Sequence, residues 1–260
     1  VNFPRYDAPP DYLLQGDWGE AGWRWLQVVL NPPGEGYETE SHGGVVPRRD
    51  WLQIALKYKE GLTGRKRLEP LYWQDPDFGI QRPGVPVVMI TWWEANAYCK
   101  WLQVHWDECQ EAQQNSQYKP EILRLPLEAE WEEAAGGGKP EGRFAWDQPG
   151  EGTTDPEEIR RRANIDNEIW NWQSSQDGCT TPVNRYPLGV SPLGVWDLNG
   201  NVEEWQANFR DPGGLPRAVR GGGWMSDRNF IRDWHDPEFF ADATGFRVVC
   251  VPRSSAQTPA

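Results

Sequence analysis

Apolar and polar positions follow a clear period in only a few windows of this chain. Residues 86–92 form an apolar, β-rich run, and in the next fourteen residues Ala95, Tyr98, Trp101, Leu102 and His105 fall at helical spacing. This pattern predicts a strand that leads directly into an amphipathic helix. His105 lies on the apolar face of that helix, which favours a core residue over a metal ligand.

A second helix is predicted in residues 124–135. Pro126 and the acidic residues after it are typical of a helix start, because anions are favoured at the positive end of the helix dipole. The run Gly136–Gly138 ends this helix. Two further helices are expected near 19–30 and 50–58, where no function can be assigned to residues 1–65.

The rest of the chain predicts short elements and long loops. Residues 136–195 are nearly all turn formers with isolated aromatics, and such a long irregular stretch inside a compact domain usually binds something. Three short apolar runs follow, at 195–205, 218–224 and 245–251. Without repeats or a low-complexity linker, residues 1–260 are expected to form a single domain.

Composition changes this picture in two ways. The chain has 17 Trp, 8 Tyr and 8 Phe with 27 Gly and 23 Pro, so we expect a loop-rich fold around a few large aromatic side chains. A net charge of −13 argues against nucleic-acid binding and suits metal cations or basic ligands. No window is apolar enough to span a membrane, and a monomer is expected.

The cysteines and histidines do not form a recognisable site. Cys99, Cys109, Cys179 and Cys250 contain no CxxC pair, and no two of the three histidines stand at ligand spacing. Scattered thiols are compatible with a reducing compartment, and the first ten residues lack a signal-peptide pattern, which favours the cytoplasm.

Eight sequence blocks, taken in order, resemble the formylglycine-generating enzyme, or sulfatase-modifying factor, family. The blocks are EPLYWQDPDF, VPVVMITWWEANAYCKWL, RLPLEAEWEEAA, FAWD, ANID, TPVNRYPLGVSPLGVWDLNGNVEEW, RAVRGGGW and TGFRVV. The resemblance implies a C-type-lectin-like α+β fold with little regular secondary structure. It also implies structural Ca²⁺ at one or two sites and a binding surface in the last part of the domain.

The first calcium loop runs from Asp197 to Glu204, where a carboxylate stands at each end of a tight turn. The resemblance implies ligation by the Asp197 and Glu204 side chains and by the carbonyls of Gly200 and Val202. A second site would use Asn164, the carbonyl of Ile165, Asp177 and the carbonyl of Cys179. Spacing alone favours the alternative, in which Asp197, Asn199 and Asn201 cap a turn and the acids are solvated.

The family's oxidase chemistry needs two cysteines after its Gly-Gly-Ser-aromatic block, because thiolates bind the copper. Ser226 and Ile231 occupy the matching positions here, and Gly223 replaces the serine of the block. No catalytic residue is therefore expected, and the chain is not predicted to be an enzyme.

The segment between RGGGW and GFRVV mixes aromatic, small and polar residues without a helical or strand period, which predicts a presented loop. It also resembles the variable segment of diversity-generating-retroelement proteins, with Arg232, Asp236 and Pro237 among the constant positions. The candidate ligand-binding residues are Trp224, Met225, Ser226, Asp227, Asn229, Phe230, Asp233, Trp234, His235, Phe239, Phe240, Ala241 and Asp242. Ordinary core packing is the alternative, and at least one of Phe239 and Phe240 is expected to point inward.

The resemblance also raises a disulfide question. In the family's secreted members the cysteine that matches Cys99 is bridged to one beside the GFR strand, and Cys250 lies two residues beyond that position. The offset of one pleat, about 6.5–7 Å, leaves the bridge open.

The sequence thus predicts a non-catalytic, receptor-like domain that displays a diversified surface to a protein or other macromolecule on a calcium-stabilised scaffold. Two alternatives stay open: a divergent metal-dependent oxidase of the family with Asp227, His235 or Asp236 as ligands, and a structural accessory domain of a larger protein.

Overall fold

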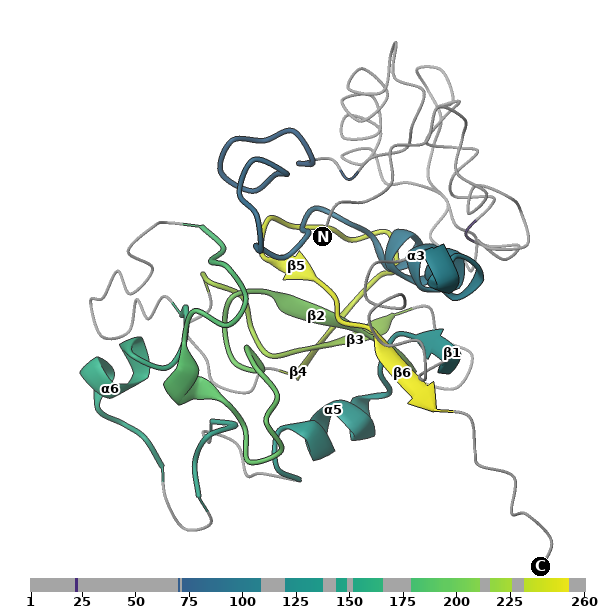
Figure 1. Cartoon of the computed structure of the whole chain (residues 1–260). Helices are drawn as coiled ribbons and strands as arrows, with labels where there is room; N and C mark the ends of the chain where they lie inside the picture. The colour runs from purple at the N-terminus through teal and green to yellow at the C-terminus, as the bar shows by residue number, and fades with distance from the viewer. Residues whose placement is uncertain are drawn as a thin grey trace, which may run out of the picture.

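The computed structural model describes residues 22, 70, 72–108, 120–137, 144–148, 152–165, 179–210, 216–225 and 232–252. Short helices and strands alternate with long irregular segments around a central sheet (Figure 1). The helices are α3 (Trp92–Val104), α5 (Glu128–Ala134) and α6 (Pro156–Arg160), with 3-10 turns at Trp106–Glu108 and Pro187–Gly189. The strands are β1 (Pro120–Arg124), β2 (Glu203–Phe209), β3 (Arg217–Arg220), β4 (Arg232–His235), β5 (Thr244–Gly245) and β6 (Val249–Pro252).

Four strands form the central sheet in the order β4-β3-β2-β5. β3 is antiparallel to both β2 and β4, while β5 runs parallel to β2. A separate pair joins β1 to β6, with Leu123 opposite Cys250 (Figure 1). The end of the chain is therefore paired with earlier segments in two places, through β6 with β1 and through β5 with β2.

The main core lies between α3 and the central sheet. Thr91 caps α3 through a capping box with Glu94, which places the buried face of the helix against Trp205 and Val219. The indole N–H of Trp92 donates to the Gln206 carbonyl at 2.9 Å, and that of Trp205 donates to the Ile90 carbonyl at 3.2 Å. These bonds satisfy the one polar atom of each ring, so large aromatics can fill the core.

The strand expected at 86–92 is not formed. Residues 86–91 are irregular, Met89 has a φ of 56°, and its amide donates to the Ala241 carbonyl at 3.0 Å. Val88 and Ile90 are buried although they belong to no sheet. An apolar run predicts burial, but its period cannot distinguish a buried strand from a buried link.

Other predicted elements have mixed outcomes. The helix at 124–135 is confirmed as α5, and the residues after it turn at Gly136 and Gly137. α6 lies within the stretch that was expected to be irregular. The helices expected near 19–30 and 50–58 lie outside the described residues apart from residue 22, which is helical.

The presented loop expected after RGGGW is partly wrong, because residues 232–235 form β4. This strand pairs with β3 in the register Arg217 to His235 and Arg220 to Arg232. It is short, lies at the edge of the central sheet and carries charged residues, so it has no apolar alternation by which to predict it.

Cys99 and Cys250 are both free thiols, so the disulfide considered from the sequence is not formed. Cys99 lies within the main core, and burial raises the pKa of its thiol to about 12. Across the described ranges, no helix combines the length and apolar character needed to cross a membrane.

Candidate ligand-binding surface and metal loops

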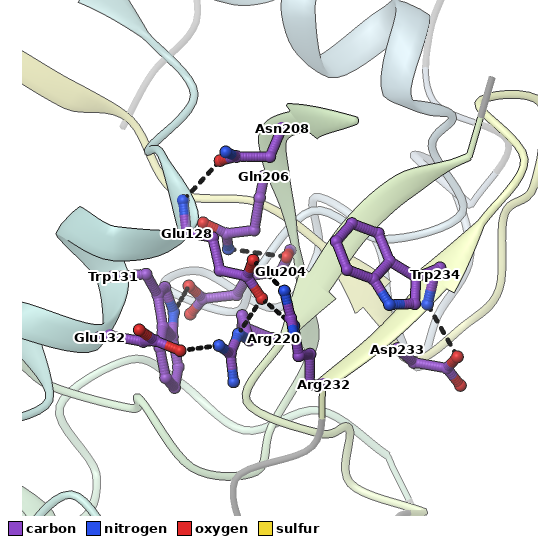
Figure 2. A network of polar contacts seen from close by, with 10 residues as sticks. All are labelled: Glu128, Trp131, Glu132, Glu204, Gln206, Asn208, Arg220, Arg232, Asp233 and Trp234. Carbon is purple, nitrogen blue, oxygen red and sulfur yellow. Dashed lines mark hydrogen bonds and ion pairs between the residues drawn. The ribbon is translucent and has the colours of Figure 1, made fainter. Parts of the chain in front are cut away.

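A buried ion-pair network fixes β4 to α5 (Figure 2). The Glu128 carboxylate, only 8% exposed, accepts two hydrogen bonds from the Arg232 guanidinium, from Nε at 2.6 Å and from Nη2 at 2.9 Å. The same carboxylate lies 2.8 Å from Nε of the buried Arg220. The hydrogen bond with Glu128 raises the pKa of Arg232, so this strand carries a permanent cation seated on the first turn of a helix.

Trp234 and Asp233 lie to one side of this network (Figure 2). The Arg232 guanidinium stands 4.9 Å from the centre of the Trp234 ring, which is a cation–π contact. The amide of Trp234 donates to Asp233 Oδ1 at 2.7 Å, and Asp233 is exposed. Arg232 thus supports a candidate ligand-binding residue directly.

His235 and Phe239 turn toward the core. Their rings stack with centroids 4.0 Å apart, and His235 Nε2 lies 3.3 Å from Glu203 Oε2 on β2. Phe239 packs against the main core cluster, in agreement with the expectation that one of the paired phenylalanines points inward. These two side chains therefore support the surface more than they form it.

Trp224 begins the other half of the candidate segment. Its amide donates to the Asn201 carbonyl at 3.0 Å, and its indole N–H donates to the Asp242 carbonyl at 3.3 Å. Met225 beside it is 53% exposed. The structure therefore brings together Trp224 and Asp242, two candidates 18 residues apart in the chain.

No role in binding was predicted for the loop at 72–78, which contacts Trp224 through Phe78. The Phe78 ring is 6.1 Å from that of Trp224 and 5.5 Å from that of Tyr72. Burial raises the pKa of the Tyr72 hydroxyl, and the Asp242 and Asp75 carboxylates raise it further. Its block EPLYWQDPDF belongs to the family resemblance, but only the fold shows which residues it contacts.

The remaining candidates fall into two groups. Phe240 and Ala241 are half-buried. The other candidate ligand-binding residues, Ser226, Asp227, Asn229 and Phe230, lie outside the described residues, as do Ile231 and the predicted metal ligand Asp177. We define the C-terminal surface by the described candidates that are exposed or half-buried and are not stacked on the core: Trp224, Met225, Asp233, Trp234, Phe240, Ala241 and Asp242.

The Asp197–Glu204 loop is a tight left-handed turn, with φ of 53° at Asp197 and 77° at Gly200. Glu204 is 3% exposed, and its Oε2 accepts from Trp131 Nε1 at 2.7 Å and from Arg247 Nε at 2.5 Å. Its Oε1 accepts from the other arm of Arg247. The carboxylate at the end of this loop is therefore already paired with a cation.

Asn199 and Asn201 do not simply cap their own turn. Asn199 Oδ1 accepts from the Ala145 amide at 2.7 Å. The Asn201 side chain accepts from the Thr181 amide at 2.9 Å and donates to the Thr181 carbonyl at 3.0 Å. Both asparagines thus hold distant segments against the loop.

The second loop is built around the buried Asn164. Its Nδ2 donates to the Cys179 carbonyl at 3.0 Å, and its own carbonyl accepts from the Asn201 amide at 2.8 Å. Its Oδ1 is buried and has no hydrogen-bond partner among the described residues. A buried acceptor without a donor is costly, and a bound cation would satisfy it.

The described ranges contain no group of three His, Cys, Asp or Glu side chains arranged to hold a metal. The predicted calcium ligands include amide and backbone oxygens, so that finding does not bear on them.

Residues 36–251 match the family model of the sulfatase-modifying factor enzyme 1-like domain. The chain belongs to this family. Among its relatives, the inactive C-alpha-formylglycine-generating enzyme 2 of Mus musculus is 28% identical, and the match covers 85% of this chain and 68% of that protein. The formylglycine-generating enzyme of Thermomonospora curvata is 29% identical, over 70% of this chain and 62% of that protein.

Family members also include parts of longer proteins. The serine/threonine-protein kinase Pkn1 of Chlamydia trachomatis serovar L2 is 31% identical over 71% of this chain, which spans 26% of the length of the kinase. Among solved structures, variable protein 1 of Treponema denticola aligns with a TM-score of 0.51 at 22% identity, over 71% of this chain and 81% of that one. The expected C-type-lectin-like α+β fold of this family is confirmed.

Proposed function

We propose that this member of the sulfatase-modifying factor family is a non-catalytic binding domain that engages its ligand through the C-terminal surface. The anchored β4 carries the proposal: the exposed Arg232 pairs with the buried Glu128 and holds a strand in which the following residues, Asp233 and Trp234, are exposed and half-buried. Rigid aromatic side chains at such positions give contact area at a low entropic cost.

The residues at the positions of the family's copper-binding cysteines support the proposal that this domain is not catalytic. Ser226 and Ile231 stand where the resemblance requires thiolates, so copper would have no sulfur ligand. At Gly223 an added Cβ would lie 2.6 Å from the Ala243 Cβ and 3.0 Å from the Ala243 carbonyl. The backbone around Gly223 thus leaves no room for the serine of the family block. The name of the relative from Mus musculus describes that family member as inactive.

The chemistry of the C-terminal surface favours a protein ligand. Trp224, Met225 and Trp234 supply apolar and aromatic contact, while Asp233 and Asp242 supply carboxylates. With a net charge of −13 on the chain, basic groups of a partner are favoured at long range. On this proposal the segment is diversified in nature, as its resemblance to retroelement variable segments implies.

The first prediction concerns Trp234. Trp234→Ala is expected to weaken binding of the natural partner about 10-fold or more, because aromatic anchors dominate interface energies. The partner would be identified by cross-linking and mass spectrometry in extracts of the source cells, and affinity measured by calorimetry. Leu193→Ala, at a residue that is 61% exposed and far from the segment in sequence, should leave affinity unchanged.

Two results would contradict the proposed function. One is equal affinity of the wild type and the Trp234→Ala variant for the partner. The other is conversion of a cysteine-containing sulfatase peptide to formylglycine by the copper-treated protein, detected by mass. Diversification is tested separately: a template repeat in the flanking DNA that matches codons 218–250 and differs only at adenines supports it, and the absence of such a repeat removes it.

We further propose that the Asn164 loop holds a structural calcium ion. The residues that would bind it are Asn164, Asp177 and the carbonyls of Ile165 and Cys179. The buried Asn164 Oδ1 supports this assignment, since an oxygen ligand without a donor fits a hard cation. When bound, the ion would hold together the two segments that supply its ligands, one at Asn164 and Ile165 and the other at Asp177 and Cys179. Nearby, Asn201 links both of them to the Asp197–Glu204 loop.

The second prediction concerns calcium. Removal of calcium by a chelator is expected to lower the thermal midpoint by about 5–10 °C, which corresponds to about 2.7 kcal/mol of linked binding energy at a hundredfold excess over Kd. Asn164→Ala should abolish this response, measured by calorimetric melts. Asn199→Ala loses a hydrogen bond of similar kind but should keep the response. A wild-type melt that is indifferent to chelator would refute the calcium assignment.

A further inference from the structure

The family resemblance treats the Asp197–Glu204 loop as a calcium site, yet its oxygens already have other partners. Both oxygens of Glu204 accept from Arg247, and Oε2 also accepts from Trp131. Asp197 Oδ2 accepts from the Asn184 amide at 3.1 Å. The Gly200 carbonyl accepts from the Val202 amide at 2.9 Å. Three of the four expected ligands are therefore engaged within the protein.

The Arg247 guanidinium has the surroundings of a bound cation. Besides the Glu204 carboxylate, its NH2 group donates to the Trp196 carbonyl at 3.1 Å and to the Asp197 carbonyl at 3.4 Å. Carboxylate and carbonyl oxygens from this loop thus converge on one positive group. A planar, permanently charged guanidinium is well suited to such a fixed fork of acceptors.

We propose that the Arg247 side chain is the cation that the Asp197–Glu204 loop holds, in the place that the family resemblance gives to calcium. The ion pair neutralises the only carboxylate that is fully buried in the loop. A divalent ion bound to the same carboxylate would lie beside the guanidinium, where two positive charges repel strongly because little water screens them.

The electrostatics of Arg247 agree with this geometry. Burial opposes the charge on the guanidinium, but the carboxylates of Glu204 and Asp197 outweigh it and raise the pKa of the arginine. The Asn164 loop differs in kind, because its buried Oδ1 has no donor among the described residues. One loop is thus closed by an internal cation, and the other has a free oxygen for a metal.

This inference stands apart from the proposed binding function. It predicts that the full chain binds at most one calcium ion, and that Arg247 ties the segment between β5 and β6 to the loop without metal. Calcium content would be counted by equilibrium dialysis with radioactive calcium, in parallel with titration calorimetry.

Three variants test whether Arg247 takes the place of calcium in this loop. Asp197→Ala removes an expected ligand but leaves the Arg247–Glu204 pair, so it should bind as many calcium ions as the wild type. Arg247→Gln removes the cation and leaves both carboxylates, so it should bind one more calcium ion than the wild type, and added calcium should raise its thermal midpoint more. Arg247→Lys keeps the charge and should not gain an ion.

Two bound ions in the wild type would overturn the proposal, and so would the loss of an ion in Asp197→Ala. Failure of a folded Arg247→Gln variant to gain an ion would also overturn it. If that variant does not fold, the ion count of Asp197→Ala decides alone. A wild type without calcium would refute the Asn164 assignment but would leave this proposal intact.

Discussion

Gly200→Ala is expected to lower the free energy of unfolding by about 2–5 kcal/mol. A Cβ at this position would lie 2.4 Å from the Asn164 carbonyl oxygen and 2.5 Å from Ile165 Cγ1. The backbone there also has a φ of +77°, which alone costs an alanine about 1–2 kcal/mol, and overpacking adds about 1–3 kcal/mol. Urea unfolding followed by circular dichroism would measure the loss.

Gly194 provides a matched control, because its φ is +80° and an added Cβ would meet nothing within 4 Å. Gly194→Ala should therefore cost only about 1–2 kcal/mol, the conformational part of the effect. Equal losses at the two glycines would show that Gly200 is not packed against the Asn164 loop. The difference between them measures how tightly the two loops fit together.

Glu128→Ala is expected to cost about 3–5 kcal/mol, because the buried Arg220 loses its buried carboxylate partner and keeps only the more exposed Glu132. Arg220 is buried, and Arg232 would lose both of its hydrogen bonds to this carboxylate. Faster hydrogen exchange at the amides of β4 should accompany the loss of stability, which chemical denaturation would measure.

Glu132 separates the general effect of a lost carboxylate from this specific one. It also contacts Arg220, but its side chain is 37% exposed, and the Arg232 guanidinium of β4 donates to Glu128 instead. Glu132→Ala should cost about 1 kcal/mol or less and leave exchange in β4 unchanged. If both variants lose the same stability, Glu128 does not anchor the strand.

Elements with local signals could be predicted from the sequence. Thr91 with Glu94 begins α3, and Gly136 follows the end of α5, so both helices carry their boundaries within a few residues. The run at 86–92 was wrong as a strand because apolar residues report burial and not backbone pairing. β4 was missed because its four residues show no strand pattern of their own. Their extended conformation comes from backbone pairing with β3.

The candidate site divides in the same way. The family resemblance identified Asn164 and the Asp197–Glu204 turn as candidate ligands, because each lies within a continuous sequence block. The decisive contacts join distant residues: Glu128 to Arg232 across 104 positions and Glu204 to Arg247 across 43. No spacing rule connects them, so the internal cation of the loop became visible only in the fold.

The two strand pairings give the part of the C-terminal surface around Asp242 a preorganised frame. β4 is held by β3, and β6 is held by β1, so the chain between them has both ends fixed before any ligand arrives. The entropy of closing this loop is lost during folding and not during association. Half-buried side chains between those ends that do not pack on the core, such as Asp242, can therefore change without altering the path of the backbone that presents them.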